Sequence, residues 1–175
     1  MERIVVRESG PGDIASIEEL YPDAFPDEDL LPLVRELLKA KPVALSLVGI
    51  IGSSLVAHVI FTTCGLAGSN NKVALLGPLV VTAARRKHGI GSAIVRAGLL
   101  RLESSSMTHV FVLGDPGFYG RLGFEPEPHV APPYPLPAEW RGAWQSMSLS
   151  SAVPPLPVGT LSAPQPWLKP ALWTS

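Results

Sequence analysis

The clearest chemical pattern in this chain is a run of three basic residues followed at once by two glycines. The stretch "RRKHGIGS" covers residues 85–92. Glycine weakens a helix interior, so this pair indicates a tight turn or a ligand that approaches bare backbone. Apolar residues at helical spacing from Ile90 onward predict that a helix begins there. Because the first N–H groups of a helix have no internal partner and favour anions, the junction predicts a phosphate cradle.

Two common phosphate-binding motifs do not fit this cradle. A Walker A loop requires GxxxxGK[ST], which the chain lacks, and a dinucleotide fingerprint requires glycine where Ile94 stands. The phosphate would therefore belong to another cofactor. The alternative from these residues alone is a helix entry that binds no ligand and carries solvated basic side chains.

The elements that must position the cradle alternate between strand and helix patterns. Apolar or β-branched runs predict strands over 2–7, 42–50, 53–64, 72–81, 108–114 and 142–150. Helical spacing predicts a helix capped by Asp13 and interrupted by Pro22, a second starting at Asp27, a third over 89–103 and a short one in 115–123. Gly77-Pro78 lies inside a strand pattern and predicts a bulge or a break in pairing. This order indicates a mixed α/β layer fold.

Composition and charge narrow the class of protein. Of the 175 residues, 46% are hydrophobic and 17% charged, which favours a folded globular chain over a disordered one. A net charge of −1 gives no basic field for nucleic acid, and no apolar run is long enough to span a bilayer. The single cysteine, Cys64, fits a reducing compartment, and no cluster has metal-ligand spacing. We therefore expect a cytoplasmic protein with no metal site, no nucleic-acid partner and no membrane partner.

Three stretches together resemble the GNAT superfamily of N-acetyltransferases. "RKHGIG" at 86–91 is similar to the family's pyrophosphate loop, [Q/R]-x-x-G-x-[G/A]. "LGPLVV" at 76–81 and "VLGDPGFYGRLGFEP" at 112–126 resemble motifs of one bacterial subgroup, LGPLxV and LGDPxYYxRFGF. The resemblance implies one GNAT-like domain over 1–150, with a proline-rich segment, 151–175, packed on the same domain.

The resemblance also implies a fold and a cofactor. The fold would be mixed α+β, with a central, mostly antiparallel twisted sheet that is splayed at the acetyl-CoA strand and flanked by about four helices. The cofactor would be acetyl-CoA, with an acetyl group moving to an amine. The implied cofactor-binding residues are Leu79, Val80 and Val81 for the pantetheine arm, and Arg86, Lys87, His88, Gly89, Ile90, Gly91 and Ser92 for the pyrophosphate.

The resemblance further implies that Tyr119 is the general acid of the transfer. Amine attack on a thioester expels a thiolate, whose conjugate acid has a pKa of about 8.5, and a phenol with a pKa of about 10 can protonate it. The alternative is a tyrosine that only packs against Phe118 or Phe124.

The base that removes the amine proton is less defined. His58 is the candidate because it lies in a strand beside the expected site, although a lone histidine in an apolar strand is often a core residue. Glu19, Asp23 and Glu28 are further candidates that surface charge would equally explain. The acceptor would be a small-molecule or peptide amine, and the protein a monomer or homodimer. Two other functions stay open: a non-catalytic acyl-CoA-binding sensor or partner module, and a globular interaction protein.

Overall fold

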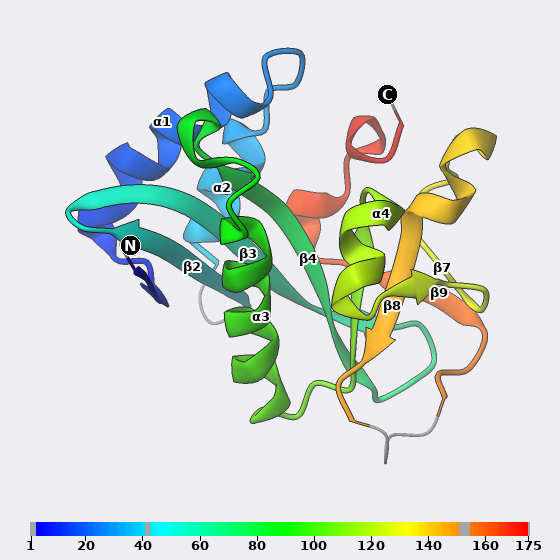
Figure 1. Ribbon diagram of the computed structural model, residues 1–175. Coiled ribbons are helices and arrows are strands. Elements are labelled where there is room, and N and C mark those ends of the chain that lie inside the picture. Colours follow the sequence, from blue (N-terminus) through cyan, green and yellow to red (C-terminus); the bar gives the residue numbers. More distant parts are fainter. Residues whose placement is uncertain (1–2, 41–42, 151–154, 175) are drawn as a thin grey trace. The chain divides into compact units, whose positions relative to one another are not determined.

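The computed structural model describes residues 3–40, 43–150 and 155–174. The longer elements are β1 (Ile4–Glu8), α1 (Ile14–Ala24), α2 (Leu31–Leu38), β2 (Ala44–Ile51), β3 (Ser54–Leu66), β4 (Lys72–Val81), α3 (Ile90–Glu103), β5 (His109–Leu113) and β8 (Trp144–Ser148) (Figure 1). The shorter ones are α4 (Pro116–Tyr119), β6 (Glu125–Pro126), β7 (Val130–Ala131), β9 (Gly159–Ser162) and several 3₁₀ turns. No helix in these described ranges is long and apolar enough to cross a membrane, and the cytoplasmic location stays a prediction.

The chain divides into two compact units. Unit 1 holds the described residues up to 61 together with 77–100. Unit 2 holds 62–76 together with the described residues from 101 onward. Because the boundaries fall inside β3, β4 and α3, each of these three elements gives one part to each unit. The sequence-based division at residue 150 stays a prediction.

Unit 1 is built on the strand order β1-β2-β3-β4. β1 pairs antiparallel with β2, with Val6 opposite Gly49, and a turn with Gly52 at φ 62° joins β2 to β3 as a hairpin. α1 and α2 bury the apolar faces that their spacing predicts, through Ile17, Leu20 and Tyr21, and Leu33, Val34 and Leu37. α3 follows β4 and buries Ile90, Ile94, Val95 and Leu99.

Unit 2 is built on the order β4-β5-β8-β6, with β9 beside β3 and β7. β4 and β5 pair in parallel from Val73 opposite His109 to Leu76 opposite Val112, directly before the cis Gly77-Pro78 peptide. β5–β8, β6–β8 and β3–β9 are antiparallel. These pairings and the four α-helices of the described chain confirm the predicted mixed, mostly antiparallel fold. The splay at Gly77-Pro78 stays a prediction.

The structure corrects three details around the first two helices. Asp13 stands at the start of α1 without capping it, because its carboxylate accepts two hydrogen bonds from Arg7, at 2.7 and 2.9 Å, and one from the Gly10 N–H. α1 runs through Pro22 to Ala24, at the cost of the one helical hydrogen bond that the proline nitrogen cannot donate. α2 begins at Leu31, four residues after Asp27.

Candidate active site

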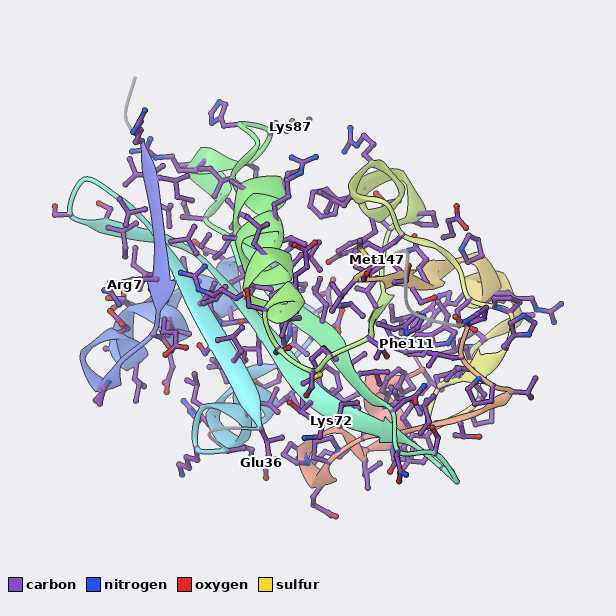
Figure 2. The ribbon with its side chains drawn as sticks, turned by 90° about the horizontal axis from the view of Figure 1, so that it is seen from below. Arg7, Glu36, Lys72, Lys87, Phe111 and Met147 are labelled. Atoms are coloured by element: carbon purple, nitrogen blue, oxygen red, sulfur yellow. The ribbon has the colours of Figure 1, made fainter. Side chains whose placement is uncertain are left out.

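The predicted phosphate cradle forms the turn between β4 and α3 in unit 1. Lys87 has φ 65° and Gly89 has φ 78°, so the backbone turns sharply twice within three residues. A non-glycine residue with positive φ is uncommon, and such outliers gather at functional sites. A methyl group on Gly89 would meet nothing within 4 Å, so open space adjoins the turn. Lys87, labelled in Figure 2, lies in the loop that leads into α3.

The backbone N–H groups of the cradle are available to a ligand. The N–H of Ala93 donates to the Gly89 carbonyl at 3.0 Å, the bond that begins the ladder of α3. The N–H groups of 90–92 therefore precede the ladder and have no acceptor inside the helix. In the described chain, the N–H groups of 87–89 donate to no backbone or side-chain acceptor. A run of free donors at a helix start fits an anionic group such as a pyrophosphate.

The side chain of Arg86, another predicted cofactor-binding residue, contacts the end of β4. Its Nε donates to the Val81 carbonyl at 3.4 Å, so the side chain closes the loop over 81–86. Val80 is buried at 2% exposure, whereas Leu79 and Val81 are half-buried on the other face of the strand. Unit 1 thus brings the two predicted cofactor-binding stretches together. Their role in binding stays a prediction.

Tyr119 lies in unit 2 at the end of α4 and is packed by aromatic rings. Phe118 and Phe124 meet it edge-on, with ring centroids at 4.8 and 5.5 Å. Gly114 leaves space for the ring, because a methyl group there would lie 2.5 Å from Cε2 of Tyr119. Asp115 caps α4 by accepting from the Gly117 N–H at 3.0 Å. The aromatic packing that the sequence offers as an alternative is therefore present.

The hydroxyl of Tyr119 is nonetheless free of protein partners. No hydrogen bond from it to another described residue is found. Since every fully buried side-chain nitrogen or oxygen in the described chain has a partner, this hydroxyl must reach solvent, although the residue is only 8% exposed. Burial, and to a lesser degree the charge of Asp115, raises the pKa of Tyr119 above its ordinary value of 10.0. The phenol therefore keeps its proton at neutral pH and points it at no protein acceptor.

His58 lies in unit 1 with both ring nitrogens occupied. Nδ1 is 2.6 Å from the Tyr21 hydroxyl and Nε2 is 2.8 Å from the Ser46 hydroxyl, which in turn accepts from Ser9 at 2.7 Å. The side chain has no exposed surface, and burial lowers its pKa from 6.5 to about 3. His58 is thus neutral, and neither of its ring nitrogens is left to meet an amine substrate. This geometry gives no support to the prediction of His58 as the base. Glu19, Asp23 and Glu28 are exposed on α1 and the following loop.

Sequence reasoning missed the partners that define these surroundings. Tyr21 and Ser46 come from α1 and β2, and only the fold shows that they bracket His58. Nothing in the sequence marks Gly114 as the residue that leaves space for the Tyr119 ring, apart from its place at the end of an expected strand. No group of three or more His, Cys, Asp or Glu in the described ranges could hold a metal ion.

No family model matches the chain, but comparison with individual known proteins places it in a family. It is 33% identical over 147 residues to the uncharacterized N-acetyltransferase YjhQ of Escherichia coli, an alignment that covers 79% of this chain and 81% of that protein. It is 27% identical over 140 residues to the uncharacterized N-acetyltransferase YhbS of the same species, with the same two coverages.

Solved structures agree with this relationship. The GNAT family N-acetyltransferase YhbS from Escherichia coli in complex with CoA superposes with a TM-score of 0.84 at 23% identity, over 97% of this chain and 94% of that one. A GNAT family acetyltransferase from Brucella melitensis in complex with acetyl-CoA gives 0.76 at 26% identity, over 95% and 99%. The fold is therefore that of the GNAT acetyltransferases. The chain belongs to the GNAT superfamily, and the predicted enzyme class, N-acetyltransferase, is confirmed.

Proposed function

We propose that this enzyme binds acetyl-CoA and moves its acetyl group directly to an amine, with Tyr119 as the general acid. Acetyl-CoA, when bound, supplies the acetyl group as a thioester. The observation that carries the proposal is the Tyr119 hydroxyl, which is open to solvent in an otherwise buried side chain and has no acceptor among the described residues. The phenol is protonated at neutral pH and no described residue accepts its proton, so the proton is available to a leaving thiolate. The raised pKa makes the transfer itself less favourable.

The cradle supports the cofactor part of the proposal. The free N–H groups of 87–92 and the positive φ of Gly89 fit a pyrophosphate, and Arg86 fixes the loop that carries them. The backbone of the half-buried residues Leu79 and Val81 would hold the pantetheine arm in the manner of an added strand. Relatives solved with CoA and with acetyl-CoA favour the same cofactor.

His58 has a structural role in this proposal. Both of its nitrogens serve to join Tyr21 to Ser46, and a pKa of about 3 makes it a poor acceptor for the proton of an amine. We assign the base to no side chain. The comparisons favour an enzyme over the non-catalytic acyl-CoA-binding module that the sequence left open.

Calorimetry and a thiol-release assay test the two parts separately. Wild-type protein should bind acetyl-CoA, and Gly89→Glu should abolish binding, because a carboxylate would enter the anion site. An amine panel should then give thiol release that depends on the acceptor. If acetyl-CoA binds and no amine yields turnover, the non-catalytic module is correct. If a folded Gly89→Glu protein binds normally, the cradle lies elsewhere.

A further inference from the structure

Gln145 of β8 is a buried carboxamide in unit 2 that the proposed function does not use. The residue is 1% exposed. Its cross-strand neighbours are Val112 in β5 and Pro126 in β6, and neither has a polar side chain. A buried amide is costly unless it finds hydrogen-bond partners, so an apolar residue would serve the packing better. The partners of the amide therefore indicate what the residue does.

The amide nitrogen of Gln145 joins two backbone carbonyls at the end of β5. Nε2 donates to the Gly114 carbonyl at 3.1 Å and to the Ala143 carbonyl at 3.3 Å. The nitrogen carries two N–H donors, one for each carbonyl. The flipped amide would set Oε1 against two carbonyl oxygens, so the hydrogen bonding fixes which atom faces Gly114.

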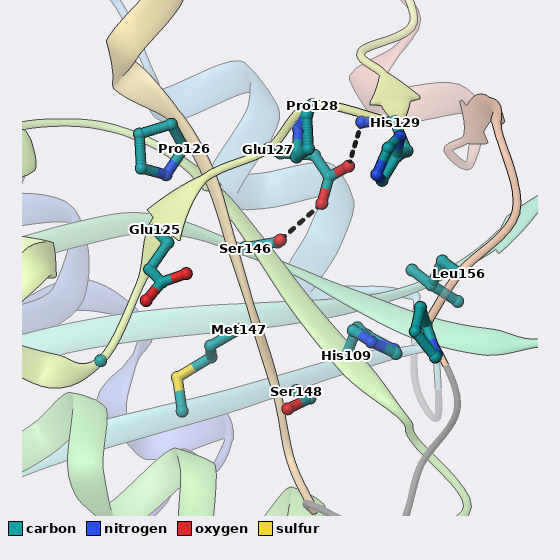
Figure 3. Close-up of a pocket in the computed structure, with 12 residues that line it drawn as sticks. His109, Glu125, Pro126, Glu127, Pro128, His129, Ser146, Met147, Ser148 and Leu156 are labelled. Atoms are coloured by element: carbon teal, nitrogen blue, oxygen red, sulfur yellow. Dashed lines mark hydrogen bonds between the residues drawn. The ribbon is translucent and has the colours of Figure 1, made fainter.

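The next residue in β8, Ser146, has a separate partner on the opposite face of the strand. Its hydroxyl donates to Oε1 of Glu127 at 2.6 Å, as Figure 3 shows. Because successive side chains of a strand alternate between its two faces, Gln145 points away from Glu127. The carboxamide thus serves the end of β5, and the turn after β6 is held by Ser146.

The carbonyl of Gly114 depends on Gln145 for its direction. Gly114 directly follows β5, and its N–H donates to the Ala143 carbonyl at 3.0 Å, which extends the β5–β8 pairing by one residue. No second donor to the Gly114 carbonyl is found in the described ranges. The Gln145 amide therefore fixes this peptide group at the point where the chain leaves the sheet for α4.

The ring of Tyr119 lies against this same residue, Gly114. A methyl group on Gly114 would come within 2.5 Å of Cε2 and 3.0 Å of Cδ2 of the ring. Phe118 and Phe124 enclose the ring edge-on. A rotation of the Gly114 peptide would move the surface on which the ring rests, so one residue links the Gln145 amide to the tyrosine.

We propose that Gln145 is a positioning residue for Tyr119 and acts through Gly114. The inference rests on the proposed function, in which the Tyr119 phenol gives its proton to the leaving thiolate. By holding the Gly114 carbonyl, the amide keeps the ring in one place, and small displacements of a catalytic group are costly. All the residues involved belong to unit 2.

Tyrosine ring NMR tests the link on the whole protein without acetyl-CoA. The chain has three tyrosines, Tyr21, Tyr119 and Tyr134, and Tyr119→Phe identifies the signals of the second. Gln145→Met has a side chain of similar length and no N–H, so it should shift the Tyr119 ring signals and leave the other two in place. Gln165→Met, at an exposed glutamine, is the matched control and should shift none of the three.

A shorter amide provides a second variant at the same position. Gln145→Asn keeps the polar group but loses one methylene, so its nitrogen no longer reaches the Gly114 carbonyl. It should shift the Tyr119 signals as Gln145→Met does, and it replaces that variant if methionine prevents folding. Unchanged Tyr119 signals in a folded variant would overturn the proposal, whatever its activity.

Kinetics separate a positioning role from a purely structural one. Gln145→Met should lower kcat by roughly tenfold and leave the KM for acetyl-CoA within about twofold of wild type. In a Tyr119→Phe background the same substitution should lower kcat no further, because the phenol that it positions is already gone. An equal further loss in that background would overturn the proposal.

The same variants distinguish this inference from the proposed function. Wild-type rates for Tyr119→Phe would overturn the role of Tyr119 as the general acid. The link from Gln145 to the Tyr119 ring would still be decided by the NMR signals, which need no turnover.

Discussion

Tyr119 and His58 are the two residues that the sequence marks for proton transfer, and their surroundings differ in kind. Both are buried, at 8% and 0% exposure. Tyr119 is enclosed by rings that leave its hydroxyl free, whereas His58 is enclosed by hydroxyl groups that occupy both nitrogens. Burial alone therefore does not distinguish the two predicted roles. The remaining capacity for a hydrogen bond does, because of these two residues only Tyr119 has a proton that no described partner accepts.

The sharpest test of this contrast is removal of the Tyr119 hydroxyl. Tyr119→Phe should lower kcat by roughly 100-fold or more, since general acid catalysis contributes about 10²–10⁴-fold. The free energy of unfolding should change little, because the hydroxyl has no protein partner to lose. Steady-state kinetics and denaturant unfolding measure the two effects. Tyr134→Phe, a half-buried tyrosine in the proline-rich loop, is the matched control, and equal rates for Tyr119→Phe and wild type would remove Tyr119 from its role.

The opposite pattern is expected at His58. His58→Ala leaves the hydroxyls of Tyr21 and Ser46 without their buried partner, which should cost about 2–4 kcal/mol of unfolding free energy. The folded fraction should keep kcat within about threefold. Ser46→Ala keeps the ring and should show a smaller loss of stability. A kcat that collapses in both variants while their stability holds would instead make His58 part of the proton path.

A third test moves the Tyr119 ring without changing its chemistry. Gly114→Ala places a methyl group 2.5 Å from Cε2 of Tyr119, so the ring must shift. We expect a fall of roughly tenfold in kcat, because small displacements of a catalytic group are costly. Gly120→Ala, whose methyl group would meet nothing within 4 Å, should behave as wild type. Similar kinetics for both variants would show that the ring position is not critical.

The smallest expected effect is a dependence of stability on pH. Below its ordinary pKa of 6.5, His58 binds a proton in the unfolded chain but stays neutral in the folded protein, where its pKa is about 3. The free energy of unfolding should therefore fall as pH drops below 6.5, by about 0.8 kcal/mol between pH values of roughly 7.5 and 6.0. Urea unfolding at the two pH values measures it. His58→Gln should show a flatter dependence, and an unchanged slope would assign the effect to other groups.

The sequence predicts the elements better than it predicts their contacts. Spacing locates β4, α3 and the turn between them, because glycine and helix periodicity are local signals. The predicted cap by Asp13 is wrong because Arg7, six residues away, donates to its carboxylate. The predicted start of the second helix at Asp27 lies four residues before the start of α2. The histidines at 109 and 129 show no pairing logic along the chain. The fold alone pairs His109 with Ser148 of β8, whereas the His129 N–H donates to Glu127 only two residues before it.

The tryptophans offer a spectroscopic consequence of the two-unit division. All four, Trp140, Trp144, Trp167 and Trp173, belong to unit 2, and three of them are buried and meet with ring centroids at 5.7 and 5.9 Å. Because every tryptophan belongs to unit 2, indole emission reports mainly on the unfolding of that unit. Circular dichroism follows both units, so a mismatch between the two melting curves would reveal separate unfolding. The four tryptophans thus serve as an intrinsic fluorescent probe of unit 2.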